Sequence, residues 1–492
     1  MTTTIGNTSS EVHPIYINGE WVESSGGRTF EQRNPACLSE ITGCFQASTA
    51  DDTRRAIDAA EQAFPKWRDT PPLARAEILK KVLAKMIERR EEIARVLTLE
   101  NGKLLSESLG EINSAIREME FQIAEGVRSL GEVMPVSMPG VLAYHTRQPL
   151  GVVGIITPWN FPFNVPTRKC APALMAGNTC VFKPASLTPQ TGLRFTELFT
   201  GAGLPPGVLN FVTGGPRDVG DTIVTDPRIK AISLTGSTDV GIQINEKASS
   251  RLARTQLELG GKNPVVVLKD ANLDDAVNAT VTAAYACAGQ WCTSTSRAIV
   301  AREIAGEFIQ RVIQKAGALR VGNGLDAETG MGPVCGTAQM RSILAYIEKG
   351  LQEGAKLLLG GKQMTDGACA DGCFIEPTVF GAVTPEMTIA QEEIFGPVLS
   401  VIEFGSLDEA IEIANGVKYG LASSVFTNNL KSALTFLERT EVGLTHVNMV
   451  TAYKEPQLTF GGIKQSGHGI PEAGKTGIEF FTEHKVAYVK YS

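Results

Sequence analysis

The stretch Gly151-Val152-Val153-Gly154-Ile155-Ile156 decides the fold. It is a short, continuously apolar run, and similar runs follow after helical stretches, at residues 179–182, 208–212 and 231–234. Strands that are apolar along their whole length and alternate with helices are typical of a parallel sheet covered on both faces. The series therefore predicts a doubly wound α/β domain.

A second series of apolar runs, at residues 264–268, 296–300 and 398–402, predicts a second α/β domain. Two domains suit a chain of 492 residues, which is longer than one hydrophobic core usually supports. Helical periodicity from 53 to 118 predicts long surface helices. The alternating stretch 480–491 predicts a strand that needs an edge to pair with, which a neighbouring subunit could supply. We expect the site between the domains.

The composition excludes several classes of function. A net charge of -7 disfavours nonspecific binding to nucleic acid or to an anionic membrane, since both attract a surplus of Lys and Arg. The nine cysteines lack the paired spacing of a zinc site or a disulfide framework, which indicates reduced thiols and no metal. Residues 1–13 do not resemble a signal peptide, and no run of about eighteen apolar residues occurs. We expect a soluble cytoplasmic protein.

Two segments about thirty residues apart offer a nucleophile and a base. Cys292 stands in a small, polar setting after Gly289, and Glu258 precedes Gly260 and Gly261, which allow close backbone approach. Taken singly, a buried structural cysteine and a solvated carboxylate are the ordinary interpretations. Together the two side chains indicate acyl chemistry in two steps, with a thiolate that attacks and a carboxylate that activates water.

Asn160 lies just past the first apolar run, where side chains of an open α/β sheet reach the ligand crevice. A turn residue is the ordinary interpretation, because Asn and Pro mark turns. In an otherwise apolar setting, its amide could donate to an oxyanion together with the backbone N–H of Cys292.

Three further segments suit a nucleotide. Lys183 follows a strand and could contact a sugar or phosphate, although such a lysine is often only solvated. Gly236 and Ser237 precede an expected helix whose N-terminal amides suit a pyrophosphate, although an ordinary cap looks the same. Glu393 and Phe395 lie on a turn that offers a carboxylate for ribose hydroxyls and an aromatic face. The GxGxxG fingerprint of common dinucleotide-binding domains is absent here.

The whole set of motifs resembles the aldehyde dehydrogenase superfamily, from about Tyr16 to the end of the chain. The resemblance rests on these motifs in this order: Pro158-Trp159-Asn160-Phe161-Pro162, Lys183-Pro184, Gly236-Ser237, Glu258-Leu259-Gly260-Gly261-Lys262, Gly289-Gln290-Trp291-Cys292, Glu393-Ile394-Phe395-Gly396-Pro397 and Phe460-Gly461-Gly462.

The resemblance implies an NAD(P)-dependent, non-acylating aldehyde dehydrogenase. Cys292 is then the nucleophile that forms a thiohemiacetal and a thioester, Asn160 completes the oxyanion hole, and Glu258 activates the hydrolytic water. It also implies a cofactor site made of Ile156, Trp159, Lys183, Ser186, Gly215, Gly236, Ser237, Glu393 and Phe395. NAD-preferring relatives often carry Glu where this chain has Ser186, so we expect NAD or NADP as the cofactor, with NADP accepted.

The substrate prediction rests on Arg168, which resembles an arginine that binds the substrate carboxylate in succinic semialdehyde dehydrogenases. A surface salt bridge is the alternative interpretation. A second arginine of those enzymes is replaced by Ala286, which counts against succinic semialdehyde itself. The remaining substrate contacts that the resemblance implies are Phe161, Trp291, Thr293 and Phe460. The chain as a whole is most similar to the α-ketoglutaric semialdehyde dehydrogenase branch, with sulfolactaldehyde, succinic semialdehyde or a broad range of aldehydes as alternatives.

The resemblance also implies a domain plan. Residues 1–132 and 149–257 are expected to bind the dinucleotide, residues 258–445 to form the catalytic domain, and residues 133–148 and 470–492 to form a small β oligomerisation element. We expect a homodimer or a homotetramer. A catalytically silent structural protein of the same fold is the alternative from another class, and the complete set of catalytic residues argues against it.

Overall fold

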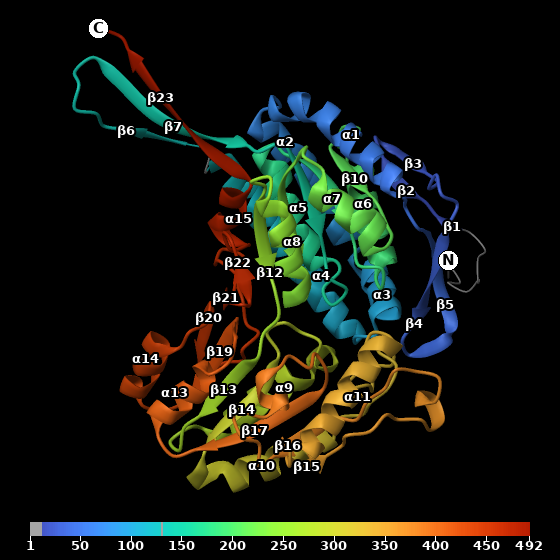
Figure 1. Ribbon diagram of the computed structural model, residues 1–492, viewed down its shortest axis with the longest axis vertical. Coiled ribbons are helices and arrows are strands. Elements are labelled where there is room, and N and C mark those ends of the chain that lie inside the picture. Colours follow the sequence, from blue (N-terminus) through green and yellow to red (C-terminus); the bar gives the residue numbers. More distant parts are fainter. Residues whose placement is uncertain (1–11, 129–130) are drawn as a thin grey trace.

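The computed structural model describes residues 12–128 and 131–492 (Figure 1). Residues 1–11, 129 and 130 lie outside the described part. The prediction that no signal peptide is present concerns residues 1–13, most of which lie there, and residues 129 and 130 belong to the predicted dinucleotide-binding domain. Two large sheets, each covered by helices, form the body of the molecule, and a long β-ribbon projects from it (Figure 1). Within the described part, no helix is long and apolar enough to cross a membrane.

The first large sheet has eight strands, and its five central strands are parallel, which confirms the predicted doubly wound arrangement. Its antiparallel edge strands were not predicted. The strands are, in spatial order, β22 (Gly467–His468), β12 (Arg254–Glu258), β11 (Ile229–Thr235), β8 (Val152–Ile156), β9 (Thr179–Lys183), β10 (Leu209–Phe211), β2 (Ile15–Ile17) and β3 (Glu20–Val22).

Helices cover both faces of this sheet because alternate side chains of each strand point to opposite sides. Val153 and Ile155 of β8 pack into one hydrophobic cluster, whereas Val152 packs into another on the opposite face. The first cluster is covered by α2 (Pro72–Glu88), α3 (Arg90–Asn101), α4 (Leu105–Arg128), α5 (Asn164–Ala176), α6 (Pro189–Thr200) and α15 (Gly474–Phe480). The second is covered by α1 (Ala50–Arg68), α7 (Asp221–Thr225) and α8 (Thr238–Ser249).

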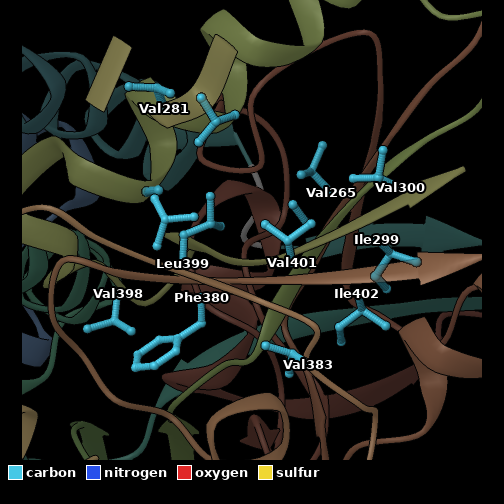
Figure 2. Close-up of a cluster of buried hydrophobic side chains, with 14 of the residues drawn as sticks. Val265, Val281, Ile299, Val300, Phe380, Val383, Val398, Leu399, Val401 and Ile402 are labelled. Atoms are coloured by element: carbon cyan, nitrogen blue, oxygen red, sulfur yellow. The ribbon is translucent and has the colours of Figure 1, made fainter. Parts of the chain in front are cut away.

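The second large sheet has seven strands, and its predicted members are again parallel neighbours. Figure 2 shows part of its core, where Val265 and Val401 lie on one face of the sheet and Ile299 and Ile402 lie on the other. The strands are β15 (Lys356–Leu359), β16 (Thr378–Gly381), β17 (Val398–Phe404), β14 (Thr295–Ala301), β13 (Asn263–Val267), β19 (Ala422–Phe426) and β20 (Leu444–Val447). The helices are α9 (Leu273–Tyr285), α10 (Arg302–Gly317), α11 (Thr337–Gln352), α12 (Thr388–Gln391), α13 (Leu407–Asn415) and α14 (Leu430–Arg439).

The predicted C-terminal strand is present as β23 (Thr482–Lys490), and a strand of its own chain supplies the edge with which it pairs. It pairs along its whole length with β7 (Val141–Pro149), which pairs in turn with β6 (Gly131–Met134). These three strands form the projecting ribbon, and β23 lies at its edge (Figure 1). Two small sheets complete the described fold: β1 (Val12–His13) with β5 (Cys37–Gln46) and β4 (Thr29–Asn34), and β18 (Tyr419–Gly420) with β21 (Ile463–Lys464).

Candidate active site

Two cavities meet at the predicted nucleophile. A larger cavity of about 360 Å³ lies on one side and a smaller one of about 200 Å³ on the other. Four residues line both of them: Asn160, Thr235, Leu259 and Cys292. A molecule in the larger cavity and a molecule in the smaller cavity can therefore both reach the Cys292 thiol, which is the arrangement that a two-substrate reaction at one sulfur requires.

The Cys292 loop is held by a residue that sequence reasoning did not single out. Asn263, the first residue of β13, donates from Nδ2 to the carbonyl oxygens of Cys292 and Ser294, at 2.8 and 2.9 Å. Gly261 must be small, because a Cβ there would lie 2.8 Å from the Cys292 carbonyl oxygen. Burial raises the pKa of the thiol to about 12, and the positive charge of Arg168 opposes that shift. The resting group is therefore a thiol.

Glu258 is the last residue of β12, and its buried carboxyl group lines the larger cavity. Its Oε2 has no hydrogen-bond partner in the described protein, and a Cβ on Gly461 would lie 3.0 Å from its Oε1. Burial raises the pKa of this carboxyl well above its ordinary value, and the charge of Glu472 raises it further, against the effect of Lys169. A carboxyl with a raised pKa and a free oxygen is suited to exchange a proton with water.

Asn160 lies in the turn between β8 and α5, where the sequence places it at the end of a strand. Its Nδ2 donates to the Gln290 carbonyl oxygen at 3.2 Å. Its own carbonyl oxygen accepts from Lys103 Nζ at 2.6 Å, and that buried ammonium is paired with Glu111 at 2.7 Å. The buried ion pair of Lys103 and Glu111 therefore holds this turn in place. No local pattern in the sequence indicates this contact.

The nine predicted cofactor residues fall into two groups. Five of them line the smaller cavity: Trp159, Gly236, Ser237, Glu393 and Phe395. The other four are not in its lining: Ile156, Lys183, Ser186 and Gly215. Ile156 and Lys183 are register partners at the carboxyl ends of β8 and β9. Ser186 donates to the Gly214 carbonyl oxygen at 3.2 Å, and open space surrounds the position of a Cβ on Gly215.

These residues fit a dinucleotide. Ser237 caps α8 without using its side chain, so the first amides of this twelve-residue helix keep their donors for an anion. Lys183 is buried, its Nζ donates only to the neighbouring Pro184 carbonyl oxygen at 3.2 Å among the described bonds, and burial lowers its pKa to about 8. An added hydrogen-bond acceptor such as a ribose hydroxyl or a phosphate would stabilise this ammonium.

The Glu393 carboxylate packs against the turn that follows Glu258. Its Oε1 accepts from the Gly261 amide at 2.9 Å, and burial raises its pKa to about 7. Trp159 and Phe395 meet edge to face, with ring centroids 5.3 Å apart, and both rings line the smaller cavity. Gln339 is a further lining residue that the sequence did not indicate.

All five predicted substrate residues line the larger cavity: Arg168, Phe161, Trp291, Thr293 and Phe460. The rings of Phe161 and Trp291 lie 5.2 Å apart. Arg168 was interpreted either as a substrate contact or as a residue in a surface salt bridge. The structure shows parts of both, because Arg168 lines the cavity and its buried guanidinium forms ion pairs. It donates to Glu472 Oε1 at 2.9 Å and lies 3.5 Å from Glu118 Oε1.

Sequence reasoning missed the polar residues around Arg168. Lys169 donates to Glu472 Oε2 at 2.7 Å and to Ser233 Oγ at 2.9 Å, deep behind the cavity. Asn164, one turn before Arg168 on α5, accepts from that guanidinium at 2.7 Å. In the sequence, the only signal for this contact was the four-residue spacing between Asn164 and Arg168, which makes the two side chains neighbours on a helix.

The fold and the two cavities that meet at Cys292 fit an oxidoreductase that acts on two substrates. The chain matches the aldehyde dehydrogenase family over residues 21–487 and belongs to that family.

Relatives of this chain are similar along nearly their whole length. The α-ketoglutaric semialdehyde dehydrogenase of Bacillus subtilis is 43% identical, with 98% of this chain and 99% of the relative covered. The α-ketoglutarate semialdehyde dehydrogenase of Haloferax volcanii is 40% identical, with 97% and 98% covered. The crystal structure of betaine aldehyde dehydrogenase from Staphylococcus aureus in complex with NAD+ has a TM-score of 0.95 and 35% identity, with 98% and 95% covered. The E. coli NADP dependent enzyme has a TM-score of 0.93 and 36% identity, with 97% and 98% covered.

These similarities confirm the predicted fold class and the predicted enzyme class. The chain is an NAD(P)-dependent aldehyde dehydrogenase with the fold of that family.

Proposed function

We propose that this aldehyde dehydrogenase oxidises a short anionic semialdehyde, of the α-ketoglutaric semialdehyde type, to its carboxylate. The observation that carries the proposal is the junction at Cys292, where a cavity containing Arg168 and Lys454 opens onto the nucleophile. The names of the Bacillus subtilis and Haloferax volcanii relatives support the same substrate class. Succinic semialdehyde and sulfolactaldehyde share the required chemistry, a short aldehyde with a negative tail.

The proposed chemistry begins when the Cys292 thiol releases its proton to solvent, and the sulfur then attacks the aldehyde carbon as its thiolate. Asn160 Nδ2 and the Cys292 amide donate to the oxyanion that forms on the former carbonyl oxygen. A bound NAD or NADP supplies the hydride acceptor for the oxidation of this thiohemiacetal. Glu258 then accepts a proton from water, the water oxygen bonds to the thioester carbon, and the carbon–sulfur bond breaks to release the carboxylate and the Cys292 thiolate.

The proposed dinucleotide site combines charge and shape. Lys183 and Glu393 would hold ribose hydroxyls, and the amides after Ser237 would hold the pyrophosphate. Ser186 and Gly215 leave room beside Lys183 for the adenosine end. The short, neutral side chain of Ser186 does not repel a phosphate, which supports acceptance of NADP.

We also propose a homodimer or a homotetramer in the cytoplasm. The projecting ribbon carries apolar side chains that a partner subunit would cover: Val133, Val486 and Tyr488 are 71%, 57% and 72% exposed. The nine cysteines, all free thiols, suit a reducing compartment. Size-exclusion chromatography with light scattering tests the assembly.

Steady-state kinetics with saturating NAD or NADP tests the proposed substrate class. Matched pairs are compared: succinic or α-ketoglutaric semialdehyde against butanal or pentanal of similar length. We expect the anionic member of each pair to lead by about tenfold or more in kcat/KM, which corresponds to ~1.4 kcal/mol of transition-state binding. Equal rates for charged and uncharged aldehydes would instead identify an enzyme of broad specificity.

A further inference from the structure

A group of charges that does not balance lies in and behind the wall of the larger cavity. We call it the wall cluster, and it consists of Arg168, Lys169, Lys454, Glu118 and Glu472. Three cations face two carboxylates, so one positive charge is in excess. Glu258 lies outside this group, because none of the ion pairs that join these described residues includes it.

The excess charge is located at Lys454. Arg168 and Lys169 each make an ion pair with Glu472 shorter than 3.0 Å, and their side chains are 6% and 0% exposed. Lys454 has longer contacts, at 3.1 Å to Asn164 Oδ1 and 3.4 Å to Glu118 Oε1, and its side chain is 21% exposed. It is therefore the cation of the cluster with the weakest pairing and the greatest access to the cavity.

Two further donors of the same wall lack acceptors in the described protein. Asn164 Nδ2 and Arg168 Nε are buried and make no hydrogen bond, although both residues line the cavity. Buried donors without acceptors destabilise the protein, because their lost hydrogen bonds to water are not replaced. A ligand carboxylate would offer lone pairs to these donors and a negative charge to Lys454. Glu118 would compete with the ligand carboxylate for the Lys454 ammonium, and its Oε2 also lacks a hydrogen-bond partner in the described protein.

We propose that Lys454, assisted by Asn164 Nδ2, binds the carboxylate tail of the semialdehyde, and that Arg168 is a positioning residue that fixes Asn164 and Glu472. This assignment rests on the proposed function. It changes the predicted role of Arg168, whose guanidinium is already engaged by two carboxylates and by the ring of Phe460, 4.6 Å away. Lys454 comes from the loop between β20 and β21, so the tail-binding group lies on a different segment from the nucleophile.

The test compares the Lys454→Met variant with a matched control, Lys475→Met, whose lysine is exposed and outside the cavity. Methionine keeps the length of the side chain and removes its charge. We expect the KM of the Lys454→Met variant for succinic or α-ketoglutaric semialdehyde to rise by about tenfold or more, the weight of one charge-assisted contact. The ratio of kcat/KM for the anionic aldehyde over kcat/KM for butanal should fall by about tenfold or more in this variant, and the control should match the wild type for both substrates.

The outcomes separate this inference from the proposed function. If the wild type itself shows no preference for the anionic aldehyde, the proposed substrate class fails. If the wild type shows the preference and the Lys454→Met variant keeps it, the assignment of Lys454 is wrong while the proposed function stands. Equal losses for both aldehydes would mean a structural role for Lys454 and would also overturn the assignment.

Calorimetry of wild-type enzyme with glutarate, an unreactive dicarboxylate, gives a second test that needs no variant. Burial and the charge of Arg168 lower the pKa of Lys454 to about 8, against the opposing effects of Glu118 and Glu472. Glutarate affinity should therefore fall as the pH rises through about 8, because the ammonium loses its proton there. An affinity that stays constant across that range would overturn the assignment.

Discussion

The carboxylate of Glu393 fills the space beside Gly260, so that an added Cβ on this glycine would lie 2.1 Å from Glu393 Oε2. The next residue completes the contact, because the Gly261 amide donates to Glu393 Oε1 at 2.9 Å. The turn that follows Glu258, the proposed base, therefore packs directly against the carboxylate of Glu393, which we propose binds ribose. This contact joins the first sheet to the loop before β17 and explains why the sequence has two glycines after Glu258.

Gly260→Ala should displace Glu393 and weaken cofactor binding. We expect the KM for NAD(P) to rise by about tenfold, or ~1.4 kcal/mol, with a smaller change in the KM for the aldehyde. Gly306→Ala is the matched control, since a Cβ at Gly306 on α10 meets no atom within 4 Å and alanine is the better helix former. Initial-rate kinetics with varied cofactor measures both variants. An unchanged cofactor KM in the Gly260→Ala enzyme would show that Glu393 does not contact the dinucleotide.

Glu258→Gln should separate oxidation from hydrolysis. The variant keeps the thiol and the oxyanion donors but lacks the proposed base, so we expect turnover to fall by about 10²–10⁴-fold. Rapid mixing with NAD and aldehyde should still give a burst of about one NADH per active site, because hydride transfer precedes hydrolysis. The Cys292→Ala enzyme is the comparison, with neither burst nor turnover. Loss of the burst in the Glu258→Gln enzyme would place Glu258 in the first chemical step instead.

Asn160→Ala should lower kcat far more than it changes affinity. The proposed oxyanion donor acts only when charge develops on the substrate oxygen, and loss of one such donor typically costs about 10²–10³-fold in kcat. The KM for the aldehyde should change by a few-fold at most. Thermal unfolding of the variant checks that the Pro158–Pro162 turn, which Lys103 holds through the Asn160 backbone, survives the substitution. A change confined to KM would contradict the oxyanion role.

The layered fold could be predicted because its signal is local. Each parallel strand is a continuous apolar run, since helices cover both faces of its sheet. The same regularity places Ile156 and Lys183 correctly, because neighbouring parallel strands end at the same edge. The antiparallel edge strands β2, β3 and β22 escaped prediction because strands of two or three residues carry no periodicity.

The wall cluster could not be predicted because its contacts join distant segments. Arg168 and Glu472 lie 304 positions apart, and nothing around either residue indicates the other. Resemblance identified Arg168 as a substrate residue, but the pairing that neutralises it appears only in three dimensions. Lys454 lies in a loop with no regular structure, so its approach to Asn164 depends on how that loop packs on α4 and α5.

Ser186→Glu should shift cofactor preference toward NAD. Ser186 lies near Lys183 after β9, and its hydroxyl donates to the Gly214 carbonyl oxygen without adding charge. A glutamate there would repel the 2'-phosphate of NADP, and like charges at close range cost about 1 kcal/mol or more. We expect the ratio of kcat/KM for NADP over NAD to fall by about tenfold. An unchanged ratio would show that the adenosine ribose does not lie beside Ser186.

The rate of hydrolysis should rise with pH until Glu258 is ionised, and Glu472→Gln should move that rise to lower pH. Burial is the main cause of the raised pKa of Glu258, and the negative charge of Glu472 is the next. Removing that charge stabilises the carboxylate of Glu258, and the positive charges of Lys169 and Arg168, freed from their partner, act in the same direction. The base is then active at a pH where the wild-type group is still protonated.

The pH profile of kcat measures this shift under conditions where hydrolysis limits turnover. The variant removes the carboxylate shared by the buried Arg168 and Lys169, so its stability should fall by about 3–5 kcal/mol. Unfolding curves must first establish a temperature at which it is folded. Glu479→Gln, which removes a half-buried partner of Arg147 and Lys475 outside the cavity, controls for a general loss of negative charge. If the profile of the Glu472→Gln enzyme moves to higher pH, the charge of Glu472 does not act on Glu258, and the base of the reaction must lie elsewhere.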